Sequence, residues 1–155
     1  MPIHVFESVK KIFFVSMCAA LLMVSGCAAS SSHGAENYFD GKRLELAIAT
    51  ENGDSDAIRR LIKDEGVDPD KTFARDTGIP LVAWPLRAKN LDGLHALLES
   101  GADPNARAYK TVEGRRLGYN NAMVYAAKMD DPRFLELLLK HGGDPDTRNS
   151  ANETL

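Results

Sequence analysis

Cysteine is absent after residue 27, since the two cysteines of the 155-residue chain are Cys18 and Cys27. The rest of the chain therefore forms no internal disulfide and has to be stabilised by packing. Basic clusters are lacking and the formal net charge is −3, which excludes the charge pattern of a nucleic-acid-binding protein. The four histidines are scattered, and no metal-binding, phosphate-binding or nucleophile motif is present. We therefore predict no catalytic residue, no metal, no cofactor and no small-molecule substrate.

The first 27 residues have the layout of a secretory signal. Two lysines precede an apolar stretch over residues 12–24, and small residues then precede Cys27. The apolar stretch is short for a membrane-spanning helix. The ending Val-Ser-Gly-Cys27 resembles the bacterial lipobox, which implies cleavage after residue 26 and acylation of Cys27. An ordinary signal peptide cut nearby, with Cys27 incidental, is the alternative.

The lipobox resemblance also implies a location. Ala28 follows the cysteine, and by similarity to enteric lipoproteins this favours an outer-membrane protein that faces the periplasm and touches the membrane through the Cys27 lipid alone. We interpret residues 1–26 as the signal peptide and residues 27–40 as a lipidated flexible tether. Translation from Met17 or Met23 would shorten the export signal and give a minor cytosolic form.

The remaining sequence repeats. Gly-x-Asp-Pro occurs at residues 66–69, 101–104 and 142–145, at spacings of 35 and 41 residues, each time after aliphatic residues at helical spacing. A glycine that ends a helix and a rigid turn predict stacked helical hairpins. Each repeated aspartate is explained by its turn, and the three are too far apart to share a calcium ion. We predict one domain over residues 41–155, with repeats at about 41–73, 74–108 and 117–148 and the start of a fourth at 149–155.

These units resemble the ankyrin repeat. Its Thr-Pro-Leu-His-x-Ala opening corresponds to residues 121–126, its leucine run and Gly-Ala-Asp ending correspond to residues 137–144, and residues 101–106 are close to the consensus ending. The resemblance implies an all-α fold, an ankyrin-repeat solenoid of about three helix-turn-helix units with hairpin fingers. A generic helical-hairpin solenoid is the alternative. Arrays of this kind usually present a binding surface for another protein.

Two departures from the pattern mark candidate binding residues. Pro85 falls inside the first helix of the second unit, where we expect it to kink and displace that helix. Trp84 beside it stands near a position where the family has alanine, and we interpret it as a core residue or, alternatively, as a partly exposed contact residue.

The second departure is the segment of residues 107–120, which is longer than its counterpart between the first two units. The resemblance places it in an outward hairpin finger. Tyrosine and arginine dominate protein interfaces, so we predict a contact surface there, with a solvated loop as the alternative. Its candidate residues are Tyr109, Lys110, Arg115, Arg116 and Tyr119.

The family resemblance extends to function. Small bacterial ankyrin lipoproteins resemble immunity proteins that bind antibacterial effectors, including phospholipases delivered by type VI secretion. We therefore expect the partner to be a secreted effector enzyme that this chain neutralises in the periplasm. The alternatives are a periplasmic envelope scaffold or stress-protection adaptor, and a cytosolic adaptor or chaperone made from an internal start.

Overall fold

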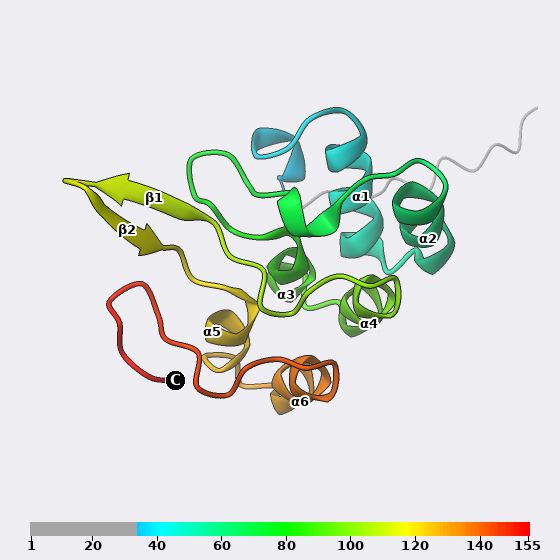
Figure 1. The fold of residues 1–155 in the computed structure, drawn as a ribbon. Helices are drawn as coiled ribbons and strands as arrows, with labels where there is room; N and C mark the ends of the chain where they lie inside the picture. The colour runs from blue at the N-terminus through cyan, green and yellow to red at the C-terminus, as the bar shows by residue number, and fades with distance from the viewer. Residues whose placement is uncertain (1–33) are drawn as a thin grey trace, which may run out of the picture.

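The computed structural model describes residues 34–155, which form two layers of helices with loops projecting from one side (Figure 1). The signal peptide, Cys27 and residues 27–33 of the predicted tether lie outside the described residues. The inner layer holds the first helix of each repeat and the outer layer the second. The helices are α1 (Gly41–Asn52), α2 (Ser55–Lys63), α3 (Trp84–Arg87), α4 (Leu91–Glu99), α5 (Ala122–Ala126) and α6 (Pro132–Lys140), with short 3₁₀ segments at η1 (Ala35–Asn37), η2 (Pro69–Lys71) and η3 (Leu81–Ala83).

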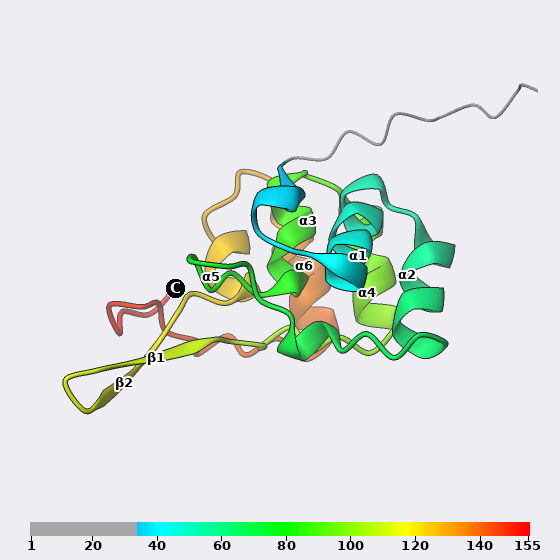
Figure 2. The ribbon, with the colours of Figure 1, turned by 90° about the horizontal axis from the view of Figure 1, so that it is seen from above.

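The described part of the chain is mostly helical, with a single two-stranded sheet. The strands β1 (Tyr109–Val112) and β2 (Arg115–Gly118) form the antiparallel hairpin that the long finger was expected to make. The hairpin projects beyond both helical layers (Figures 1 and 2). The all-α prediction is therefore confirmed for the helical hairpins, and the finger adds a small sheet to it.

Polar side chains begin each outer helix. Asp54 accepts a hydrogen bond from the Ala57 amide (3.0 Å), and Asn90 accepts one from the Gly93 amide (2.9 Å). These bonds satisfy amides that have no partner inside the helix. The amide group of Asn90 also donates to the backbone carbonyl of Glu51 (2.9 Å) and so joins α4 to the end of α1.

The Gly-x-Asp-Pro turns are linked to one another by the residue that follows the proline. The Asp103 amide donates to the Asp70 carboxylate, and the Asp144 amide donates to the side-chain oxygen of Asn105, both at 2.8 Å. Asn105 also donates to the Gly142 carbonyl at 2.9 Å. The linking role of Asp70 and Asn105 was not predicted from the sequence, because the partner of each residue lies in the next repeat.

Replacing Asp70 by asparagine is expected to stabilise the protein slightly at neutral pH. Desolvation raises the pKa of Asp70, and the neighbouring Asp103 raises it further, although the hydrogen bond from the Asp103 amide opposes the shift. When folding raises the pKa of a carboxyl, the free energy of unfolding of the protein falls as pH rises through that range. Asparagine accepts the same bond without a charge, so we expect the melting temperature to rise by about 1–3 °C at pH 7.

The gain from Asp70→Asn should shrink below about pH 4, where the carboxyl becomes protonated in both states. Asp146→Asn is the matched control, because Asp146 occupies the same position in the third turn and is exposed. Thermal unfolding followed by circular dichroism at pH 7 and pH 3.5 compares them. A fall in melting temperature for Asp70→Asn at pH 7 would contradict the prediction.

Pro85 is the second residue of the short helix α3. It lies in the first turn of α3, directly after the 3₁₀ segment η3. At that position the missing N–H costs no internal hydrogen bond. The first helix of the second unit is thus divided into a 3₁₀ segment and a short α-helix, and the kink and displacement of the whole helix stay predictions.

Trp84 is a core residue. It is fully buried, and its indole N–H donates to a carboxylate oxygen of Glu51 at 2.8 Å. The rings of Tyr38 and Phe39 pack against it, with centroids at 5.4 and 4.8 Å. The candidate contact role of Trp84 is corrected, because no surface of its side chain is available to a partner.

The folded body begins before residue 41. Ala35 and Phe39 are buried in the core, and the backbone carbonyl of Tyr38 accepts a hydrogen bond from the Arg75 amide at 3.0 Å. Residues 35–40 therefore cover the first repeat. This part of the predicted tether belongs to the packed domain, and the prediction is corrected there.

Candidate protein-binding surface

The hairpin β1–β2 is closed by a two-residue turn. Tyr109 pairs with Gly118 and Val112 with Arg115, which leaves Glu113 and Gly114 in the turn. Their φ angles are 49° and 75°, and positive values at both positions give the turn whose twist matches that of paired strands. The finger is thus a preformed structure, whose two strands hold their side chains in defined directions.

The two faces of the hairpin carry different side chains, because successive strand residues point to opposite faces. On one face the Arg116 guanidinium lies 3.7 Å from the centre of the Tyr109 ring. On the other face the ammonium nitrogen of Lys110 lies 5.4 Å from the centre of the Tyr119 ring. Each face therefore presents an aromatic ring with a cation held beside it.

Tyr119 holds the base of the hairpin against the rest of the protein. It is partly buried, and its amide donates to the Ala108 carbonyl at 2.9 Å. Its ring packs on Gly78 so closely that a Cβ atom there would lie 2.7 Å from a ring carbon. Tyr119 is thus mainly a support, which leaves its ring little area for a partner.

The structure brings five of the predicted contact residues onto one hairpin. Tyr109 is 52% exposed, and Lys110, Arg115 and Arg116 are also exposed. Val112 and Leu117, which the sequence analysis did not single out, add exposed apolar surface to the same hairpin. The surface combines tyrosine and arginine, which are enriched in protein interfaces, with exposed apolar side chains.

A small apolar hollow lies between the inner helices α3 and α5. Its volume is about 140 Å³. We call it the inner notch, and its lining consists of Ile79, Ala83, Leu86, Arg87, Tyr125 and Met129. Sequence reasoning missed it because its walls come from separate repeats.

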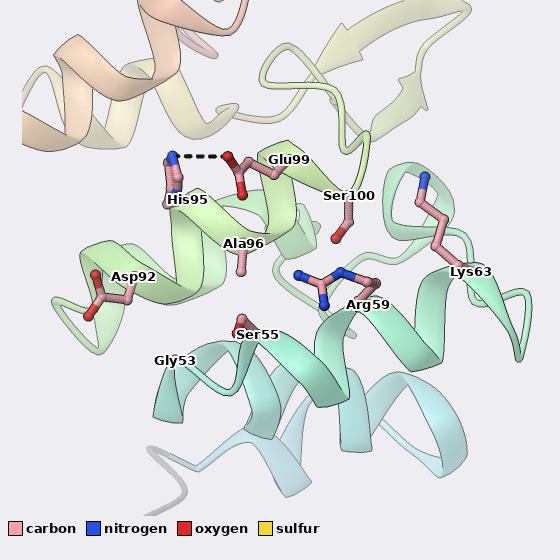
Figure 3. Close-up of a pocket in the computed structure, with 9 residues that line it drawn as sticks. All are labelled: Gly53, Ser55, Arg59, Lys63, Asp92, His95, Ala96, Glu99 and Ser100. Carbon is pink, nitrogen blue, oxygen red and sulfur yellow. Dashed lines mark ion pairs between the residues drawn. The ribbon is translucent and has the colours of Figure 1, made fainter.

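A larger groove separates α2 and α4 in the outer layer (Figure 3). Its volume is about 690 Å³, and its walls carry charges of both signs. Arg59 pairs with Asp56 at 3.2 Å, and His95 lies 3.5 Å from a carboxylate oxygen of Glu99. Among the described residues, no group of three or more His, Cys, Asp or Glu side chains is placed to hold a metal ion. The groove is a polar surface between two helices.

Comparison with known proteins supports the ankyrin repeat family. Residues 119–150 match the family model of the ankyrin repeat. Protein PhlB of Serratia liquefaciens is 32% identical over 115 residues, which are 73% of this chain and 45% of that protein. The E3 ubiquitin-protein ligase Ufd4 of Drosophila melanogaster is 30% identical over 74% of this chain and 4% of its own length. A rice BTB/POZ domain and ankyrin repeat-containing protein, NH5.2, is 31% identical over 70% of this chain and 19% of its own length.

The chain spans less than half the length of each of these curated relatives. What the matches support is therefore the repeat itself, a non-catalytic unit through which proteins bind other proteins. Within residues 34–155 no helix is both long and apolar enough to cross a bilayer.

Proposed function

We propose that this chain is a protein-binding ankyrin-repeat lipoprotein whose hairpin β1–β2 contacts the partner. One observation carries the proposal: Tyr109 and Arg116 are stacked at 3.7 Å on an exposed, projecting hairpin. A contact surface that is already ordered incurs little conformational entropy cost when it binds. Tight binding then needs few additional contacts.

The proposed location is the periplasmic side of the outer membrane, with Cys27 acylated. The charged start, the apolar stretch and the small residues before Cys27 support it. Each buried methylene of an acyl chain contributes about 0.8 kcal/mol, so several chains hold a protein firmly at a membrane. The hairpin would then meet partners that enter the periplasm.

The proposed partner is an antibacterial effector, phospholipase-like and delivered by type VI secretion, which this chain neutralises. The resemblance to immunity proteins of that kind and the export signal both support it. A protein that protects against an enzyme attacking the membrane has to be present where that enzyme arrives. A preordered binding surface suits the blocking of an enzyme, because dissociation is slow when many fixed contacts have to break.

Cells that lack this chain are expected to die beside siblings that deliver the effector and to grow normally in pure culture. A growth defect in pure culture, with normal survival beside the siblings, would contradict the immunity function and would favour an envelope scaffold. Mass spectrometry of the amino-terminal peptide from the outer-membrane and cytosolic fractions tests the location, since lipidated protein should begin at an acylated Cys27 and a form from Met17 or Met23 would stay in the cytosol.

The double substitution Tyr109→Ala/Arg116→Ala is expected to abolish this protection. Interface residues of these types often contribute about 2 kcal/mol each, so affinity for the effector should fall about 1000-fold if the two losses add. The matched control is Leu139→Ala/Lys140→Ala, which removes an exposed apolar and a cationic side chain from α6 in the outer layer. Survival of siblings carrying each variant is counted after co-culture. Equal protection by both variants would show that the hairpin is not the contact surface.

A further inference from the structure

We propose that the inner notch receives an apolar side chain from an acidic segment of the partner protein, and that Arg87 pairs with a carboxylate of that segment. The inference rests on the proposed function, in which this side of the array binds a protein, and it adds the chemistry of what is bound. The partner segment is thus defined by one aliphatic or aromatic anchor next to acidic residues.

The notch has the size and lining for one apolar side chain. Its floor is formed by Ala83 and Leu86, which are buried, and its walls include Ile79 and Met129, which are half-buried. A cavity of about 150 Å³ with an apolar lining admits a benzene molecule. The notch, at about 140 Å³, therefore matches a single leucine- or phenylalanine-sized group.

Arg87 is held at the rim by aromatic rings. Its guanidinium carbon lies 4.6 Å from the centre of the Trp84 ring and 5.3 Å from the centre of the Tyr38 ring. Stacking of this kind uses the face of the guanidinium and leaves its N–H donors at the edge available. Arg87 is in none of the ion pairs of 4.0 Å or less recorded among the described residues. The geometry therefore leaves a fixed cation whose donors suit an incoming carboxylate.

Tyr125 also lines the notch and adds a hydroxyl group that can donate a hydrogen bond. Desolvation raises the pKa of its hydroxyl, and the nearby charge of Arg87 opposes that shift in part. The hydroxyl therefore stays protonated at neutral pH. A carboxylate placed between Arg87 and Tyr125 would accept hydrogen bonds from both groups, which is the arrangement that stabilises a partly desolvated charge.

Further cations lie on the hairpin. Gly78, which contacts the Tyr119 ring at the base of the hairpin, is the sequence neighbour of Ile79 in the notch. In the described residues Lys110 and Arg116 of the hairpin are engaged with aromatic rings and form no ion pair. This concentration of positive charge, in a chain whose net charge is −3, favours an acidic partner segment over a neutral or basic one.

The test uses the fluorescence of Trp84, the single tryptophan of the chain, which lies directly under Arg87. The full chain is titrated with the acetylated, amidated peptide Glu-Glu-Leu-Glu-Glu, which has no fluorescence of its own in this range. We expect a saturable change in emission. The same peptide with glycine in place of leucine, and the peptide with lysine in place of each glutamate, should bind at least tenfold more weakly. Equal responses to the three peptides, or no response, would overturn the inference.

Three variants locate the site. Arg87→Met keeps the alkyl chain on Trp84 and removes the charge, and we expect at least a tenfold loss of affinity for the acidic peptide. Lys140→Met makes the same charge change on the outer layer and should bind as the unaltered chain does. Met129→Glu places a carboxylate in the notch wall and should also abolish binding, which keeps the test decisive if Arg87→Met unfolds. Retention of binding in folded Arg87→Met and Met129→Glu would overturn the inference.

The outcomes separate this inference from the proposed function. If Tyr109→Ala/Arg116→Ala cells lose protection and the acidic peptide gives no signal, the notch inference fails and the hairpin function stands. If the peptide binds in the notch and cells without the chain survive sibling attack, the immunity function fails and the notch inference stands. A concentration-dependent dimer that Arg87→Met abolishes would show that a second copy occupies the notch, and would overturn the inference as well.

Discussion

Alanine in place of Gly93 is expected to destabilise the protein by about 3 kcal/mol or more. In a helix alanine is ordinarily about 1 kcal/mol more favourable than glycine, so the expected effect has the opposite sign to the propensity. The reason is the approach of α4 to α1: a Cβ atom on Gly93 would lie 1.9 Å from the backbone oxygen of Thr50. The backbone of one helix has to move, and overpacking of this kind typically costs about 1–3 kcal/mol, with larger values where backbone is displaced.

Urea unfolding followed by circular dichroism measures this loss. Asp92→Ala is the matched control, because Asp92 is the exposed neighbour of Gly93 on the same helix. We expect the control to change stability by less than about 1 kcal/mol. An unchanged or raised midpoint for Gly93→Ala would mean that α1 and α4 do not approach as closely as the structure shows.

Gly93 illustrates which parts of the fold can be predicted from the sequence. The turns at residues 66–69, 101–104 and 142–145 have local signals, because the glycine, aspartate and proline determine the backbone of their own segment. The aliphatic spacing likewise predicts α4 and α6. Nothing near Gly93 in the sequence indicates that Thr50 of the preceding repeat lies against it. Contacts between repeats depend on the stacking geometry, which a single sequence does not contain.

The candidate site shows the same division. The resemblance to the ankyrin repeat implied an outward finger at residues 107–120, and the tyrosines and arginines of this segment predicted a contact surface on it; the hairpin carries these residues. The stacking of Arg116 on Tyr109 depends on the strand register, which the turn at Glu113 and Gly114 determines. Trp84 was a candidate contact residue because it departs from the family pattern. Its burial follows from Phe39 and Glu51, which lie in other segments.

Phe39 leads to the second prediction of large effect: Phe39→Ala should destabilise the protein by about 3–5 kcal/mol. Its side chain is 3% exposed, and its ring meets that of Trp84 edge to face at 4.8 Å. Alanine would leave a cavity beside Trp84, and the surrounding α1 and α3 are too closely packed to fill it. Because small domains are stable by about 5–15 kcal/mol in total, this loss would unfold a substantial fraction of the protein at 37 °C.

Asn37→Ala is the matched control for Phe39→Ala. Asn37 is exposed, and its contribution to Arg75 is through the backbone carbonyl (3.4 Å), which alanine retains. Urea unfolding of each variant is followed by Trp84 fluorescence. We expect the emission of Phe39→Ala to shift to the red, because water reaches the indole. If the two variants unfold at the same urea concentration, residues 35–40 are a tether and not part of the fold. A lower urea midpoint for Phe39→Ala than for Asn37→Ala would instead show that residues 35–40 cover the first repeat at Trp84. This segment would then stabilise the end of the array from which the chain leads back to Cys27.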